Sequence, residues 1–238
     1  MANCPHCGGI VEENAVTCPN CQQPLSAPGP APAGSIVQPG KYLKEGWELF
    51  KLYPGGFAGF ALLLAFINVL LHYLPWLGGP ISLAIGGPLG AGFYVVCAKL
   101  MQRRTPEFQD FFTGFKFFVP LLLVSVVSGL LIVVGLIFLI LPGIFLMVCY
   151  LFPSFIVIDQ RLDFWPAMEL SRKTVQQQWF GYLIFLLLLI LVNLVGALLL
   201  GVGLLVSIPV SACAVAAAYA DIFGLQSDYS EDMPRLKA

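Results

Sequence analysis

Three long blocks without a single charged side chain constrain the fold of this chain more than any other feature. The blocks run from Leu52 to Ala98, from Phe117 to Ile158 and from Thr174 to Ala220, and none contains Asp, Glu, Lys or Arg. They are 47, 42 and 47 residues long, and each has Pro or Gly near its middle. Because one membrane-spanning helix needs about 20 residues, each block is long enough for two spans. The sequence therefore predicts three helical hairpins with six spans in all.

The composition of the whole chain agrees with this prediction. Of the 238 residues, 58% are hydrophobic and only 11% are charged, and the mean hydropathy is +0.86. A typical soluble domain is about 25% charged, so we expect an all-α polytopic membrane protein. The expected spans are about 56–74, 79–100, 119–140, 142–158, 181–200 and 203–222.

A short segment with helical spacing of apolar residues precedes each block. The faces are Leu43, Trp47 and Phe50 in the first segment, Phe108, Phe112 and Phe115, joined by Phe111 and Phe118, in the second, and Phe164, Met168, Ser171, Val175 and Trp179 in the third. Amphipathic helices of this kind lie in the membrane interface. With Pro54, Val119 and Gly181 as corresponding points, the chain is predicted to repeat one unit three times: an interfacial helix followed by a membrane hairpin.

The basic residues predict how the hairpins are oriented. The three turns inside the blocks contain no Lys or Arg, so all 12 basic residues lie on the other side of the predicted spans. Positive charge is retained on the cytosolic side of a membrane. We therefore expect both termini in the cytosol and the protein in a cell membrane, the inner membrane of a bacterium.

Four cysteines near the N-terminus form the most specific motif. Cys4, Cys7, Cys18 and Cys21 follow the pattern C-x2-C-x10-C-x2-C, in which two tight turns aim four thiolates at one tetrahedral zinc ion. A segment this short cannot build a core, so the bound metal would supply its folding energy. The alternatives are two disulfides or free thiols, and a reducing cytosol disfavours the disulfides. We predict one structural zinc ion and, because four cysteines leave no open position, no catalytic role for it.

The domain organisation follows from these features. Residues 1–24 are predicted to form a short zinc ribbon, 25–40 a Pro- and Gly-rich linker, 41–222 the six-helix membrane domain and 223–238 a polar tail. The linker composition predicts an extended, semi-rigid tether. The segment before residue 41 has no Lys or Arg, which argues against nucleic acid as the partner of the ribbon; a protein partner fits better.

Few polar residues lie inside the predicted spans. Asn68 and Asn193 are expected to form hydrogen bonds between helices, and His72 lies near the outer end of its span. The remaining cysteines, Cys97, Cys149 and Cys213, are expected to act as small apolar side chains. A transporter would instead need a water-accessible cavity that Asn68, Asn193 and the nearby serines line together.

The membrane part resembles a broad bacterial family of six-helix membrane domains. The residues that carry the resemblance are LPGIFLMVCYLFPSFIVID at 141–159 and AMELSRKTV at 167–175. The family includes the membrane domain of some glycerophosphodiester phosphodiesterases and related uncharacterised integral membrane proteins. It implies a Pro-Gly turn at Pro142 and Gly143, a span that ends at Asp159, and a following helix with Ala167 and Ser171 in its core. The phosphodiesterase catalytic domain has no counterpart in this sequence, so the resemblance implies a membrane module of unassigned function.

These observations favour a non-enzymatic membrane protein. No nucleophile, acid and base occur together at a spacing that predicts catalysis, and Asp159, Asp163 and Glu169 are expected at a solvated, basic interface. The first hypothesis is a scaffold or accessory protein that displays its zinc ribbon to protein partners on the cytosolic face. The alternative is a transporter or lipid-handling protein, which the predicted repeat and the proline-broken spans favour. The sequence does not identify a small-molecule substrate.

Overall fold

A computed structural model describes residues 2–3, 10–11, 37–74, 78–138, 140–199 and 201–225. The only strands in this part are β1 (Ala2–Asn3) and β2 (Ile10–Val11), an antiparallel pair. All other described elements are helices: α1 (Pro39–Leu52), α2 (Pro54–His72), α3 (Gly78–Met101), η1 (Phe108–Phe117), α4 (Phe118–Phe138), α5 (Ile140–Cys149), α6 (Pro153–Gln160), α7 (Phe164–Gln177), α8 (Trp179–Leu198) and α9 (Leu204–Phe223). The predicted all-helical architecture of the membrane domain is confirmed.

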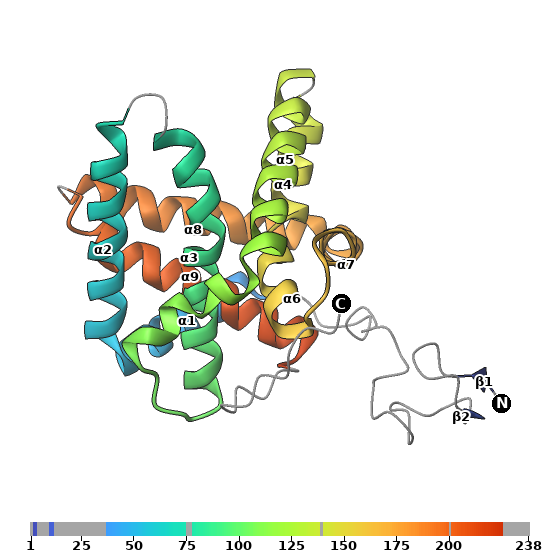
Figure 1. Ribbon diagram of the computed structural model, residues 1–238, viewed down its shortest axis with the longest axis horizontal. Helices are drawn as coiled ribbons and strands as arrows, with labels where there is room; N and C mark the ends of the chain where they lie inside the picture. Colours follow the sequence, from blue (N-terminus) through green and yellow to red (C-terminus); the bar gives the residue numbers. More distant parts are fainter. Residues whose placement is uncertain are drawn as a thin grey trace.

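Among the described residues, six helical segments are long and apolar enough to cross a membrane, as predicted. They form the hairpins α2–α3, α4–α5–α6 and α8–α9 (Figure 1). The fourth segment is broken into α5 and α6 just before Pro153. Proline lacks an N–H group and clashes with the preceding turn, so it can begin α6 but cannot continue α5. The chain is a multi-pass membrane protein by this criterion of length and composition.

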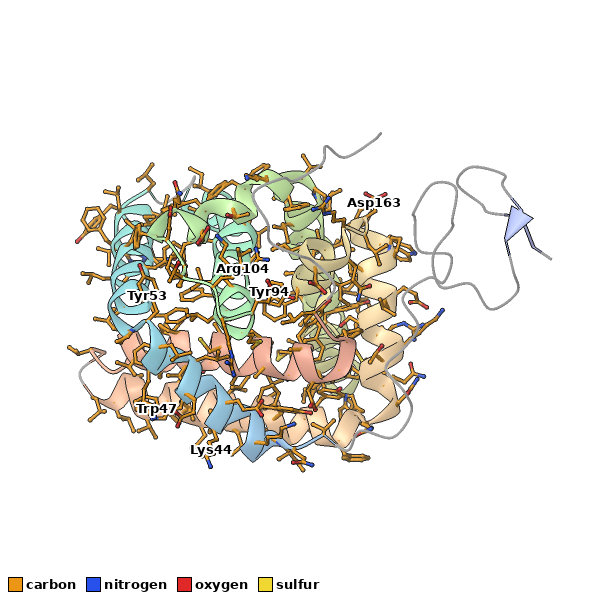
Figure 2. All side chains as sticks on the ribbon, turned by 90° about the horizontal axis from the view of Figure 1, so that it is seen from below. Lys44, Trp47, Tyr53, Tyr94, Arg104 and Asp163 are labelled. Atoms are coloured by element: carbon orange, nitrogen blue, oxygen red, sulfur yellow. The ribbon has the colours of Figure 1, made fainter. Side chains whose placement is uncertain are left out.

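The hairpins do not all run in one direction. In Figure 1, α2, α3, α4 and α5 run upright, whereas α8 and α9 run across them; Figure 2, turned by 90°, shows the α8–α9 hairpin lying across the view as well. Membrane helices tilt by about 20° on average and rarely by more than about 40°. Spans of this arrangement therefore need strong tilt in at least one hairpin, a feature that hydropathy did not predict.

Each interfacial helix packs on the hairpin of the preceding copy, and the three contacts close a ring. Helix η1 packs on α3, α7 packs on α5 and α6, and α1 packs on α9. A glycine or a serine lies at each close approach. A Cβ atom on Gly46 would lie 2.6 Å from the Ala214 backbone, and one on Gly114 would lie 2.0 Å from the Pro88 carbonyl oxygen. Ser171 donates to the carbonyl oxygen of Cys149 at 2.6 Å. This cyclic packing agrees with the predicted threefold repeat.

The helices of the first and third copies align at a constant offset, which differs from the offset that the sequence comparison suggested. Helix α7 starts at Phe164, 125 residues after α1 starts at Pro39, and both helices are 14 residues long. The same offset relates Pro54 at the start of α2 to Trp179 at the start of α8. The position that corresponds to Pro54 is therefore Trp179 and not Gly181, because a two-residue shift brings whole helices into alignment.

The interfacial segments differ from one another in detail. The second segment is a 3-10 helix, and Phe108, Phe112 and Phe115 of its predicted aromatic face remain 38–44% exposed. Phe111, which the prediction joined to that face, is fully buried and stacks on Phe60 with the ring centres 4.3 Å apart. The predicted face is therefore divided, because its exposed rings meet the surroundings of the protein and Phe111 docks the helix.

The fully buried side chains form one core across all three hairpins. Its largest members are Tyr42, Tyr94, Tyr219, Phe57, Phe60, Phe111, Phe152 and Phe185. Figure 2 shows Tyr94 in the interior, whereas Lys44 and Trp47 project from α1 at the edge of the molecule. The core is therefore rich in aromatic rings that come from the interfacial helices as well as from the spans.

Candidate functional site

The four cysteines that are predicted to bind zinc lie outside the described residues. They are Cys4, Cys7, Cys18 and Cys21. Within the described part of the chain, no group of three His, Cys, Asp or Glu side chains could hold a metal ion. The donor set itself fits zinc, because four thiolates in two C-x-x-C turns complete a tetrahedral shell. The zinc site stays a prediction.

The segment that leads from the N-terminus into α1 is fixed to the third hairpin. The backbone N–H of Val37 donates to Oε1 of Gln178 at 2.9 Å, and Val37 is 8% exposed. The Val37 Cβ atom lies 2.8 Å from the position that a Cβ atom on Gly181 would take, so a side chain at Gly181 would collide with Val37. Helix α1 then begins at Pro39, inside the range predicted for the linker. The N-terminal segment therefore joins the membrane domain at the junction of α7 and α8.

A groove of about 370 Å³ lies between α1 and α9, and we call it the α1–α9 groove. Its lining combines charged and apolar side chains: Lys41, Glu45, Glu48, Leu49, Leu52, Met101, Ala217, Ala220 and Asp221. A lining that combines both kinds of side chain suits an amphiphile better than a purely polar solute.

The Asp221 carboxylate joins the two sides of this groove. Lys41 Nζ donates to one carboxylate oxygen at 2.8 Å, and the Tyr42 hydroxyl donates to the other at 2.8 Å. The hydrogen bond to Asp221 raises the pKa of Lys41. Burial, followed by the hydrogen bond to Asp221, raises the pKa of Tyr42 well above its usual range. Both donors therefore keep their protons at neutral pH, and the contact is structural.

A second carboxylate, Asp159, is buried, whereas the sequence suggested a solvated position. Asp159 is 4% exposed, and its Oδ2 accepts a hydrogen bond from the Tyr219 hydroxyl at 3.0 Å. The Tyr219 ring lies edge-on to Tyr94 with the centres 5.2 Å apart. The expectation failed because Asp159 follows an apolar span and precedes Arg161, which resembles an interfacial position in sequence. Helix α9, distant in sequence, covers it.

The third acid, Glu169 on α7, is partly exposed, and Asp163 is exposed as expected. Glu169 pairs with Arg172 at 2.8 Å and with Lys173 at 3.4 Å. The hydrogen bond from Arg172 lowers the pKa of Glu169 to about 2. A carboxyl group that is ionised and paired in this way is not available as a general acid or base near neutral pH.

Two of the three single cysteines lie together. Cys97 on α3 and Cys213 on α9 have their Sγ atoms 3.1 Å apart, and both are 0% exposed. Cys149 is also fully buried. The prediction that these side chains act as small buried groups is consistent with this packing. Their pairing was not predicted, since nothing in the local sequence indicates that α3 meets α9.

The intramembrane asparagines form hydrogen bonds between helices, as predicted, and the structure shows that their partners are serines. Ser82 donates to Asn68 Oδ1 at 3.4 Å, and Ser207 donates to Asn193 Oδ1 at 3.0 Å. Each serine lies 14 residues after its asparagine. The first pair joins α2 to α3 and the second joins α8 to α9, so the same Asn–Ser contact holds two of the three hairpins. The common spacing was visible in the sequence and was overlooked.

Comparisons with protein-family models, with curated proteins and with solved structures found no match. The resemblance to bacterial six-helix membrane domains therefore stays a prediction. The function has to be argued from the sequence motifs and from the geometry of the described residues.

Proposed function

We infer that this chain is a non-enzymatic multi-pass membrane protein that holds a zinc ribbon on the cytosolic side and binds protein partners through it. The observation that carries this proposal is the contact of Val37 with Gln178 and Gly181. It fixes the last residues of the linker at the α7–α8 junction, on the side where the basic residues are predicted to lie. Val37 thus gives the chain that precedes it a defined attachment point beside the membrane domain.

The polar contacts of the spans support a structural role for the membrane domain. Asn193 is bonded to Ser207 and to Ser211, whose Oγ lies 2.7 Å from the amide nitrogen. Asn68 belongs to another hairpin and lines a separate cavity that does not include Asn193. The single polar cavity that a transporter would need is therefore not what these residues form. Transport becomes the less favoured proposal.

Zinc content tests the first half of the proposal. Purified, reduced protein should contain one zinc ion per chain, measured by elemental analysis. The double variant Cys4→Ser with Cys18→Ser should contain none, because two thiolates cannot complete the shell. Cys149→Ala is the matched control: this cysteine is buried in the membrane domain, and its loss should leave the zinc content unchanged. Reduced wild-type protein without zinc would remove the site.

Proximity labelling tests the second half. A labelling enzyme is fused to the N-terminus of the full chain, of a chain without residues 1–24 and of the double cysteine variant. We expect the two altered chains to lose the same set of labelled proteins, while labelled membrane neighbours remain. An unchanged set of labelled proteins would refute recruitment by the ribbon and leave the zinc result standing.

Lipid handling is the second candidate, and the α1–α9 groove favours it because its lining combines charged and apolar side chains. The test is transbilayer movement of a fluorescent phospholipid in proteoliposomes. Leu52→Lys would place a charge in the groove wall. Trp165→Lys, at an equally exposed site on α7 outside the groove, is the control. Movement that the first variant abolishes and the control preserves would support this candidate; no movement in the wild type would reject it.

A further inference from the structure

A second groove lies between α2, α3 and α9, and we call it the α2–α3 groove. Its volume is about 280 Å³, and Asn68 and Ser82 are among its lining residues. The rest of the lining is apolar or glycine and includes Ile85, Gly86, Gly90 and Phe93. The third copy of the repeat contains the same Asn–Ser pair, so the hydrogen bonds of the two hairpins can be compared directly.

In the α8–α9 hairpin the asparagine amide uses both of its protons. Nδ2 of Asn193 donates to the Leu189 carbonyl oxygen at 2.8 Å and to Ser211 Oγ at 2.7 Å. Ser207 donates to Oδ1 of the same side chain. An amide inside a membrane has no water as a partner, so each satisfied proton stabilises the hairpin.

In the α2–α3 hairpin the corresponding arrangement is incomplete. Asn68 Nδ2 donates to the Leu64 carbonyl oxygen at 2.9 Å, and Oδ1 accepts the longer bond from Ser82. Four residues after Ser82 stands Gly86, where the third copy has Ser211 four residues after Ser207. Glycine has no side chain to accept the second amide proton. The groove occupies the place of the missing hydroxyl group.

The floor of the groove is open to an occupant. A Cβ atom built on Gly86 or on Gly90 would meet no atom within 4 Å. Asn68 is one helical turn from the end of α2 at His72, so the polar part of the groove lies close to the hairpin turn. The apolar part extends toward Phe93, deeper in the domain.

This distribution matches one chemical class. A glycerolipid has ester carbonyl groups, which accept hydrogen bonds, near the membrane surface, and an acyl chain that runs from them into the hydrocarbon core. We propose that the α2–α3 groove binds one acyl chain of a glycerolipid, with its ester carbonyl oxygen accepting the second amide proton of Asn68.

The test uses full-length protein in nanodiscs that contain phosphatidylethanolamine with a photoactivatable diazirine on its acyl chain. After illumination, labelled peptides are identified by mass spectrometry. We expect labelling within α3 in the stretch from Ile85 to Phe93. Gly90→Leu places a side chain on the groove floor and should abolish this labelling. Gly129→Leu is the matched control, because a Cβ there also meets no atom within 4 Å but Gly129 lies on α4, outside the groove.

Two further variants test the hydrogen bond itself. Asn68→Leu removes the donor and should lower lipid labelling by about two- to tenfold, the range expected for one neutral hydrogen bond. Gly86→Ser restores the arrangement of the third copy and should also lower labelling, because the new hydroxyl group competes for the amide proton. Gel filtration and thermal unfolding of each variant show whether it is folded.

Several outcomes would overturn the proposal. Equal labelling in the Gly90→Leu and Gly129→Leu proteins would mean that the lipid contacts α3 without a specific groove. Dimers that are cross-linked through Cys introduced at Ser82, and that Gly90→Leu disrupts, would assign the groove to a second copy of this chain. The zinc ribbon does not enter this test, so the proposed function and the lipid site can fail separately.

Discussion

The first and second spans of each hairpin have opposite surroundings. In the first spans, which include α2, α4 and α8, 22%, 11% and 22% of the apolar window is buried within the chain. In the second spans, which include α3, α5 with α6, and α9, the shares are 56%, 44% and 61%. The second spans form the centre, and each interfacial helix packs on one of them. Each repeat therefore has an outer helix that faces the bilayer and an inner helix that organises the fold.

Sequence explains this difference through the size of side chains. Helix α8 is a run of leucines and other large apolar residues, whereas α9 carries Ala214, Ala216, Ala217 and Ala218 in its buried part. Lipid tails are as apolar as leucine, so hydrophobicity alone does not draw membrane helices together. Small residues allow backbones to approach closely and so select the inner helices.

The largest effect concerns whether α8 and α9 form a membrane hairpin at all, because they run across the other two (Figure 1). Val202, in the turn between them, is 67% exposed. If the hairpin spans the membrane, Val202→Cys should react with an impermeant maleimide added outside intact cells. Lys44→Cys, on the predicted cytosolic side, should react only after permeabilisation. If Val202→Cys behaves like Lys44→Cys, the distinction between outer and inner spans holds for two hairpins only.

The next effect concerns the seam at which α1 packs on the inner helix α9. Gly46→Ala would drive a methyl group into the Ala214 backbone, and overpacking of this kind costs about 1–3 kcal/mol. Gly40→Ala, on the same helix, meets no atom within 4 Å and should stabilise the helix by up to about 1 kcal/mol. Thermal unfolding in detergent should therefore shift in opposite directions. Equal shifts would contradict the close approach.

Much of this fold could be predicted from the sequence, namely the number and the bounds of the spans. Charge-free blocks and turn residues placed the spans within about two residues of the helices; the first span was expected at 56–74 and α2 covers Pro54–His72. The burial of Asp159, the Cys97–Cys213 contact and the crossing of α8 over the other hairpins were not predicted. Hydropathy measures transfer out of water and does not distinguish lipid from a neighbouring helix. Contacts between distant spans leave no local signal.

The candidate sites divide in the same way. A metal motif is local, so four cysteines at fixed spacing predict zinc without a tertiary structure. Each of the two grooves forms only where three or more segments meet. The role of Asn68, Ser82 and Gly86 becomes clear only by comparison with the corresponding residues of α8 and α9. The internal repeat was the one available signal for these sites, and its register had to come from the aligned helices.

A smaller effect separates hydrogen bonds on inner and outer helices. Ser171→Ala removes a buried bond between α7 and α5 and leaves the Cys149 carbonyl oxygen without this donor, at a cost of about 1–3 kcal/mol. Ser128→Ala removes a bond to the preceding turn of the outer helix α4 and should change stability by less than about 0.5 kcal/mol. Thermal unfolding of the two variants under identical conditions measures the ratio. Comparable losses would mean that position in the repeat does not govern stability.

The smallest effect is expected at the partly exposed charges of α7, where Glu169 pairs with Arg172 and Lys173 of the same helix. The pKa of Glu169 is about 2 in the folded protein and about 4.3 in an unfolded chain. A lowered pKa means that ionised Glu169 stabilises the fold above pH 4.3 and that this contribution is lost as the pH falls toward 2. The carboxylate is 36% exposed, so solvent screening limits the contribution to below about 1 kcal/mol. Glu169→Gln should lower the unfolding temperature slightly at pH 7 and not at pH 2. If Glu169→Gln lowered the unfolding temperature at pH 7 more than Gly46→Ala does, the stability of this protein would depend mainly on its surface charges and not on the packing of its inner helices.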